Sequence, residues 1–533
     1  MMLILLISAF IVTILPPAFL SVYALYKFTD NSRRVPLLIC IGLISSFFVL
    51  APHSDTFTGL DVAMYRIMTQ SFINGRGLQD NDAAFAKVPE KVKPLLLYRS
   101  AVGTSARLTR DSVFELKNFP NSTTSPFFLP TLPLSAAGAS NLGIDPELLV
   151  PIFAVLWIVC IFSVAWATGK GWGLVSTIAL LYGTAWPSWF LRGFFPEAIG
   201  GVLIASVIVI AFNLKNCWHA YALYGLMLGL SLAFHPTLVL LMIPVALLLI
   251  ARSGKIQETI ALVIGGGVGT LPLFLINKYI CQPYGDFTNL NSLIAMCSGS
   301  PEILAVTVAL LVAALSGIAI IVMAHIKIVR NFFSNSSVCK IIILSSVAVC
   351  AVSLTLPFIM KGRLLSGFIS MWSGIGFFAV TLLIALFFTA FSKNRSLSGS
   401  LLVAAFSVCL LLFSFIKGTE VHVGIWSQRR FAPIIFCLIS ILSVPLATGV
   451  RSVAIFNKQK GVLLVIILLA PAAAHFATSP AAYYLSNEKG AVQFADTVKA
   501  YIDETGNNAL TVFDYYPHSV PYQANSSKAI FGI

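Results

Sequence analysis

Long apolar stretches alternate with short polar connections along almost the whole chain. A helix needs about 20 apolar residues to cross a hydrocarbon core of roughly 30 Å, and about 14 stretches approach that length. They cover residues 2–26, 35–52, 147–168, 171–189, 196–213, 218–234, 236–251, 258–280, 303–326, 340–360, 365–391, 399–417, 430–449 and 461–478. Because several are near the lower limit, the pattern predicts an all-α polytopic membrane protein with 12 to 14 transmembrane helices.

Two polar segments interrupt this pattern and divide the chain. We expect N-terminal transmembrane helices over 1–52, an external loop over 53–146, a transmembrane helix bundle over 147–478 and an external tail over 479–533. The first stretch lacks the basic start of a cleavable signal and is expected to stay as an anchor. In the tail, 488–505 has a helical pattern and 509–513 a strand pattern, which predicts a small α/β piece.

The external loop begins with an amphipathic pattern. Apolar residues recur at near-helical spacing at Leu60, Met64, Ile67, Met68 and Phe72. Such a helix is expected to lie flat on the membrane with its apolar side down. The turn-forming residues Asn74 and Gly75 follow it, so the pattern predicts a helix over 60–72.

Proline and glycine mark two features inside the bundle. The stretch from Tyr221 to Ile250 is too long for one span, and Pro236 after His235 removes a helix hydrogen bond, so we expect two helices that turn at the outer face. The glycines in 225–229 and 265–269 lie in apolar helices and follow no strand. They therefore predict close helix packing in preference to phosphate binding.

The composition excludes a soluble globular protein. Hydrophobic residues make up 58% of the chain and charged residues 10%, with a mean hydropathy of +0.91. The net charge of +14 is spread a few residues at a time over short connections, which indicates a topology signal and contact with anionic membrane lipids, not nucleic acid. Cys281 and Cys297 share one external connection, where they either form a disulfide or are buried thiols.

The basic residues also predict the orientation, because short cytoplasmic loops are enriched in lysine and arginine. With the N-terminus outside, cytoplasmic connections hold 15 of the 34 basic residues and short external ones hold 7, leaving 12 in the long loop and tail. The 53–145 loop and the tail then share the outer face.

The leading candidate for chemistry is Asp61, at the membrane edge of the loop, with Asp55 as the alternative. In the predicted helix, Asp61 and Tyr65 are one turn apart and face the same way. A carboxylate there can accept a proton from an attacking sugar or lipid hydroxyl. The competing interpretation is a solvated aspartate that caps the helix.

Basic residues at the outer edge form the second group of candidates. Trp426, Arg429 and Arg430 precede a predicted helix. Guanidinium groups and a helix N-terminus together can bind a phosphate group. The alternative is that the two arginines extend toward the lipid headgroups of the outer leaflet. Further external candidates are Arg192, Glu197, His235, Lys361 and Arg363. Glu197 also has an ordinary interpretation as an acid in the first turn of a helix after proline.

In this order along the chain, these positions resemble the GT-C superfamily of membrane glycosyltransferases, which includes the protein mannosyltransferases and the aminoarabinose transferase of lipid A. Asp61, Tyr65 and Gly75 are similar to the start of the family's first external loop. The segment 125–130 is similar to its proline-rich return, and 426–430 to its late tryptophan-x-x-arginine motif. Phe195-Pro196-Glu197 is similar to the family's acid in a small external loop, and His235-Pro236 is similar to its arginine-proline helix break. Val62 stands where the family's loop motif has its second acid.

The resemblance implies an inverting sugar transfer on the outer face of a bacterial inner membrane. Asp61 would deprotonate the acceptor, and Arg429 or Arg430 would stabilise the phosphate of a polyprenyl-phosphate sugar, with Arg192, Lys361 and Arg363 as further phosphate ligands. The acceptor would be a lipid, a glycan or a protein. No cofactor is predicted, and a divalent metal is not indicated because Val62 breaks the carboxylate pair.

Two other classes of function fit the sequence less well. An O-antigen polymerase or ligase also acts on lipid-linked glycans, but would place its decisive residues in a large late loop, whereas the largest loop here is early. A transporter or lipid flippase would show charged or broken helices at the midplane and repeat symmetry. Neither is evident along this chain.

Overall fold

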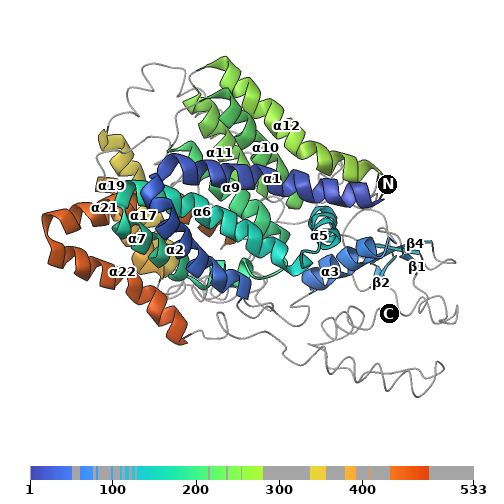
Figure 1. Ribbon diagram of the computed structural model, residues 1–533, viewed down its shortest axis with the longest axis horizontal. Coiled ribbons are helices and arrows are strands. Elements are labelled where there is room, and N and C mark those ends of the chain that lie inside the picture. Colours follow the sequence, from blue (N-terminus) through green and yellow to red (C-terminus); the bar gives the residue numbers. More distant parts are fainter. Residues whose placement is uncertain are drawn as a thin grey trace.

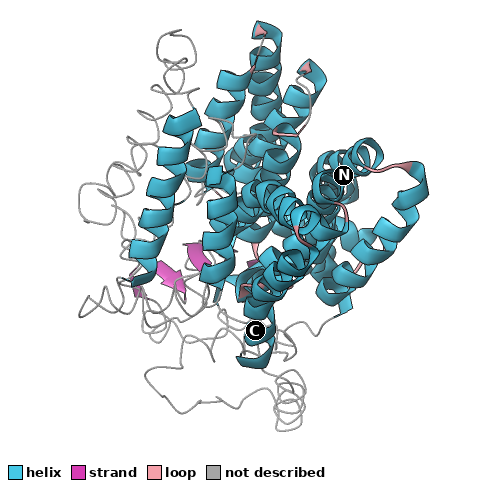
Figure 2. Ribbon diagram, turned by 90° about the vertical axis from the view of Figure 1, so that its left-hand side faces the viewer, coloured by secondary structure: helices cyan, strands magenta, loops and turns pink. Residues whose placement is uncertain are grey.

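A computed structural model describes the protein over residues 2–50, 60–75, 80–81, 98–99, 108–110, 114–118, 123–126, 129–213, 217–235, 238–253, 255–279, 336–355, 378–391, 407 and 432–478. Over these residues the protein is mostly helical (Figure 2). Three helical segments in this part are long and apolar enough to cross a membrane: Met2–Phe28, Pro146–Gly169 and Ala432–Phe456. Shorter apolar helices pack beside them, which together indicates a protein associated with a membrane.

The helices follow the predicted apolar stretches closely. They are α1 (Met2–Phe28), α2 (Asn31–Leu50), α3 (Leu60–Ile73), α5 (Thr131–Asn141), a 3₁₀ turn η2 (Pro146–Leu148), α6 (Leu149–Gly169), α7 (Gly171–Tyr182), α8 (Ala185–Phe190), α9 (Pro196–Ala211), α10 (Trp218–Phe234), α11 (Val239–Arg252), α12 (Ile256–Tyr279), α17 (Ser336–Thr355), α19 (Phe378–Phe391), α21 (Ala432–Phe456) and α22 (Lys458–Thr478). The single helix predicted over 171–189 is instead two, α7 and α8, separated at Gly183 and Thr184. Stretches 303–326 and 399–417 lie outside the described residues, except for Ser407.

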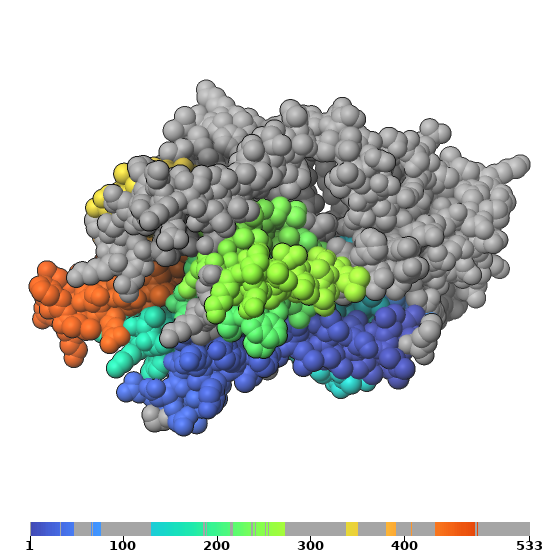
Figure 3. Space-filling view, turned by 90° about the horizontal axis from the view of Figure 1, so that it is seen from above, coloured from blue at the N-terminus to red at the C-terminus, as the bar shows by residue number. Residues whose placement is uncertain are grey.

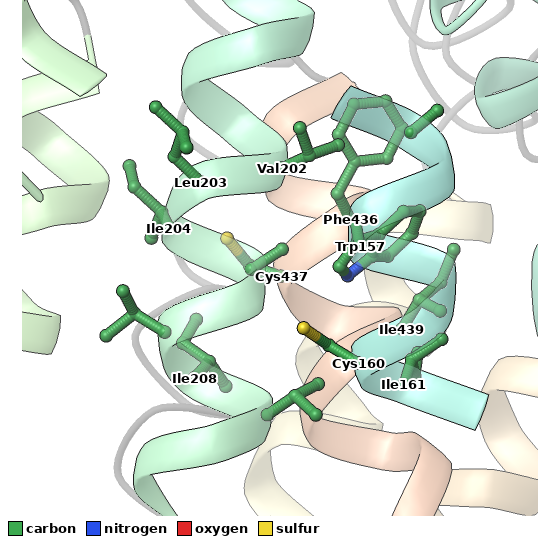
Figure 4. Close-up of a cluster of buried hydrophobic side chains, with 14 of the residues drawn as sticks. Trp157, Cys160, Ile161, Val202, Leu203, Ile204, Ile208, Phe436, Cys437 and Ile439 are labelled. Carbon is green, nitrogen blue, oxygen red and sulfur yellow. The ribbon is translucent and has the colours of Figure 1, made fainter. Parts of the chain in front are cut away.

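The centre of the bundle is formed by α6, α9 and α21 (Figure 4). The Trp157 indole packs on Phe436 with ring centroids 5.5 Å apart, and its Nε1 donates a hydrogen bond to Ser440 Oγ at 2.9 Å. A buried indole N–H needs such a partner. Cys160 and Cys437 are fully buried in the same cluster, as expected for cysteines that serve as packing residues.

Helix α1 joins this core to the short helix α5. The Thr13 hydroxyl of α1 donates to Ser135 Oγ of α5 at 3.3 Å. A Cβ on Gly138 would overlap the carbonyl of Leu6, so the two helices meet at van der Waals distance. Further along α1, Ser21 Oγ donates to the Leu156 carbonyl of α6 at 2.8 Å, which fixes α1 along both helices.

Glycines allow α10 and α12 to pack backbone against backbone. A Cβ on Gly225 would overlap the Leu262 carbonyl, and one on Gly229 would overlap the Gly266 carbonyl. The predicted role of these glycines in helix packing is confirmed. The opposite side of α12 is apolar and exposed, and α12 lies at the surface together with α1 (Figure 3). An exposed side of this kind suits contact with lipid.

The turn between α10 and α11 is also where the sequence predicts it. Helix α10 ends at Phe234 and α11 begins at Val239. His235 takes an extended backbone conformation between them, with φ −155° and ψ 127°. The prediction of two helices in place of one long span is confirmed.

Basic residues gather at one end of the bundle. They are found at the α1–α2, α6–α7, α11–α12 and α21–α22 turns: Lys27, Arg33, Arg34, Lys170, Arg252, Lys255, Arg451, Lys458 and Lys460. Arg451 Nη1 donates to the Thr168 carbonyl at 2.8 Å, and Arg252 lies over the Phe212 ring at 5.4 Å. Figure 1 shows the α1–α2 and α21–α22 turns at the left, whereas α3, α5 and the strands lie at the right. Among the described residues, the two ends of the bundle therefore differ in charge as well as in structure.

The loop after α2 contains a small antiparallel sheet that the sequence pattern did not predict. Its strands are β1 (Asp80–Asn81), β2 (Tyr98–Arg99), β3 (Leu108–Arg110), β4 (Phe114–Asn118) and β5 (Thr123–Pro126). They are arranged in the order β1-β5-β4-β3-β2. Pairs such as Glu115 with Ser125 and Thr109 with Glu115 set the register, which shifts by a bulge between Leu116 and Asn118. Strands of two to five residues contain too few alternations to be detected from periodicity.

Candidate functional site

Helix α3 is present over Leu60–Ile73, as predicted for 60–72, and it packs on protein. Met68 and Phe72 are each 2% exposed and form a cluster with Leu6 of α1 and with α5. The expectation that the apolar side of α3 simply faces the membrane is therefore wrong for these two residues. Their partners come from helices distant in sequence, which the local pattern cannot reveal.

The backbone of α3 places Asp61 on the packed side of the helix. Asp61 lies in the first turn, four residues before Tyr65 and eleven before Phe72. Because residues at these spacings share one face of an α-helix, Asp61 belongs to the stripe that continues through Tyr65, Met68 and Phe72. Tyr65 is 4% exposed and joins the main core of the bundle. Residue 61 thus begins the side of α3 that is turned toward the bundle.

Turn geometry ends α3 where the sequence predicts. The Asn74 amide donates to the Gln70 carbonyl at 2.9 Å and the Gly75 amide to the Phe72 carbonyl at 3.0 Å. Gly75 has φ +71°, a conformation that glycine adopts without steric cost. This confirms the turn predicted from Asn74 and Gly75.

An ion pair connects α3 to the start of α6. Arg66 Nε lies 2.7 Å from Glu147 Oε1, and Arg66 Nη2 donates to Glu147 Oε2 at 2.8 Å. The side chains are 16% and 29% exposed, so the pair is partly shielded from water. Asp145 Oδ1 accepts a hydrogen bond from the Glu147 amide at 2.9 Å and so caps η2. Neither member of the ion pair was predicted as a site residue, because only their contact distinguishes them.

A second polar contact joins the start of α9 to the end of α10. Glu197 Oε1 is 3.5 Å from His235 Nε2, and Glu197 is only 3% exposed. Arg192 is also buried, at 7% exposure, in the short connection before α9. The connection is held by an edge-to-face contact of Phe190 with Phe195, whose ring centroids are 5.3 Å apart. The structure therefore brings together the predicted residues Glu197 and His235, while Arg192 lies buried in the connection that leads into α9.

Glu197 begins α9 as its sequence context predicts. Pro196 stands at the first helical position and Glu197 in the first turn, where an acid is favourable at a helix N-terminus. Burial to 3% goes beyond this ordinary position, because a carboxylate at a solvated helix start stays exposed. His235 supplies one partner for it, at the end of α10.

The first residues of α21 meet α9 near this contact. A Cβ on Gly201 would lie 2.8 Å from Pro433 Cβ, and Gly201 follows Glu197 by one helical turn. Ala432 and Pro433 are both buried. Arg429 and Arg430 come immediately before this helix start in the sequence.

Several predicted residues lie outside the described part of the chain. They are Asp55, Lys361, Arg363, Trp426, Arg429 and Arg430, and the same holds for Cys281, Cys297 and the 479–533 tail. Among the residues that are described, no three His, Cys, Asp or Glu side chains form a group able to hold a metal ion.

Comparisons with known proteins returned no relatives. No family model matches the chain, and no curated protein or solved structure matches it.

Proposed function

We propose that this protein is a multi-pass membrane glycosyltransferase of the GT-C kind, which transfers a sugar from a polyprenyl-phosphate carrier to a lipid, glycan or protein acceptor. The proposal includes 12 to 14 transmembrane helices, extending the helices described above to the remaining apolar stretches. The reaction would take place on the outer face, at the end of the bundle away from the basic turns.

The strongest support is the position of residue 61. It lies at the start of an amphipathic helix, on the side packed against α1 and α5. A backbone position on the bundle side of α3 suits a carboxylate that is to act on a substrate held against the membrane helices, whereas one on the opposite side would suit a plain solvated acid. Asp61 would then take the proton of the acceptor hydroxyl as its oxygen attacks the anomeric carbon and the lipid phosphate leaves.

The polar contact between the start of α9 and the end of α10 also supports the proposal. Charged groups buried in a membrane bundle are costly and commonly mark functional sites. Arg192 and Glu197 are buried, the His235 side chain is 14% exposed, and Pro433 at the start of α21 packs one turn beyond Glu197. Arg192, with Arg429 or Arg430, would bind the donor phosphate, since guanidinium groups pair bidentately with phosphate oxygens.

The test uses purified protein in lipid nanodiscs with radiolabelled polyprenyl-phosphate sugars and candidate acceptors. We expect transfer by the wild type from at least one such donor. We expect Arg429→Gln and Arg430→Gln, made singly, to raise the KM for the donor, with Arg33→Gln at the opposite end as the matched control. Absence of transfer from every lipid-linked sugar, with substrate flux into liposomes instead, would favour a transporter and refute the proposal.

A further inference from the structure

The Arg66–Glu147 ion pair attaches α3 to the bundle at a point separate from its apolar contacts. Met68 and Phe72 contact α1 and α5, whereas Arg66 reaches the residues that start α6. Successive residues of an α-helix are about 100° apart, so Arg66 lies well around the helix from the buried stripe. Two attachments on different sides of a helix restrict its rotation about its own axis. A single apolar stripe restricts that rotation less.

The geometry of the pair suits this restriction. Both oxygens of Glu147 lie close to the guanidinium group, 2.7 Å from Nε and 2.8 Å from Nη2, and the Nη2 contact is a charge-assisted hydrogen bond. Glu147 is itself held in place, because Asp145 caps its amide and η2 leads directly into α6. The carboxylate is thus part of the rigid start of a membrane helix.

We infer that Arg66 and Glu147 are a positioning pair that sets the orientation of α3 and thereby the place of Asp61. Asp61 precedes Arg66 by five residues on the same helix, so a rotation or lift of α3 would carry both residues together. The inference rests on the proposed function, because Asp61 matters only if it is the base. Neither Arg66 nor Glu147 is assigned a contact with substrate.

The first readout follows α3 itself and does not need activity. Hydrogen–deuterium exchange of peptides covering 60–73 would be measured for Arg66→Gln, Glu147→Gln and the double variant Arg66→Glu/Glu147→Arg. We expect roughly fivefold faster exchange in the single variants, the order expected for loss of a partly exposed ion pair. The double variant should recover part of the protection, since it restores the pair but puts a cation at a helix N-terminus. Gln70→Ala is the control, because Gln70 is an exposed α3 residue bonded only locally to Asn74.

The second readout separates positioning from binding. With Asp61 displaced, kcat for transfer should fall by roughly tenfold or more while the KM for the lipid donor changes little. Arg66→Lys should give an intermediate kcat, because lysine keeps the charge but lacks the planar guanidinium group that lies against both oxygens of Glu147.

The outcomes distinguish the two proposals. Unchanged exchange of α3 in both single variants would overturn the positioning role, whatever the activity. Faster exchange with unchanged kcat would show that α3 need not be held for catalysis and would also overturn it. If the wild type transfers no sugar, the proposed function fails and the link to Asp61 falls with it, while the exchange data still decide whether the pair holds α3.

Discussion

At the residue scale, Trp157 and Ser440 form the clearest polar contact in the centre of the bundle. The two side chains come from α6 and α21, are almost completely buried and share a hydrogen bond of 2.9 Å. Removing the acceptor would leave the indole N–H without a partner in an apolar interior, where it keeps its full desolvation cost.

We therefore expect Ser440→Ala to lower stability by about 1–3 kcal/mol, measured as the thermal unfolding midpoint of the protein in detergent. Ser443→Ala is the matched control, since Ser443 is equally buried but donates only to the Ser440 carbonyl of its own helix. Equal losses in the two variants would mean that the contact between α6 and α21 contributes nothing specific.

The candidate site shows what single residues could and could not reveal. Glu197 and His235 were selected from the sequence separately, and the structure places them 3.5 Å apart. The Arg66–Glu147 pair was missed, because its members are 81 positions apart and each looks like an ordinary surface charge. Long-range pairing depends on how helices pack, which no local pattern contains.

At the element scale, helix boundaries were predictable because the length of an apolar stretch and the position of a proline are read directly from the local sequence. Helices α1, α9, α10 and α22 end within a few residues of the predicted stretches, and the break after Phe234 is where Pro236 requires it. The sheet of the loop was not predictable, since its strands are only two to five residues long and show too little alternation.

The contact between α10 and α12 gives a prediction at this scale. Gly229→Ala would place a methyl group against the Gly266 carbonyl and the Gly269 Cα, so the helices must move apart. We expect destabilisation by about 1–3 kcal/mol from overpacking, which exceeds the gain of up to about 1 kcal/mol in helix propensity. Thermal unfolding in detergent measures the difference.

Gly267→Ala is the control for this prediction, because nothing lies within 4 Å of a Cβ built at Gly267. The same gain in helix propensity without a clash should leave the protein as stable as the wild type or slightly more so. Comparable destabilisation in both variants would contradict close packing at Gly229.

At the scale of the whole molecule, the two ends of the bundle carry different groups. The α1–α2 and α21–α22 turns, which carry basic residues, lie at one end, and α3 and α5 lie at the other (Figure 1). If the basic end is cytoplasmic, residues at the two ends must be reachable from opposite sides of the membrane.

Cysteine labelling of sealed vesicles measures this arrangement. In a background in which the exposed Cys217 and the predicted external Cys281 and Cys297 are replaced by serine, we expect Asn74→Cys to react with an impermeant thiol reagent from the outer side. Asn31→Cys and Gln459→Cys, both exposed in the basic turns, should react only after the membrane is opened. Labelling of all three introduced cysteines from the same side of the membrane would contradict the proposal that the two ends of the bundle face opposite sides.

The most direct measurement of the central claim compares sugar transfer and donor binding in the wild type and in Asp61→Asn. Loss of a general base should lower kcat by about 10²–10⁴-fold while the Kd for the polyprenyl-phosphate sugar stays close to the wild-type value. Asp145→Asn, which changes a carboxylate that caps η2, should retain most of the activity. Transfer by Asp61→Asn at the wild-type rate would contradict the account.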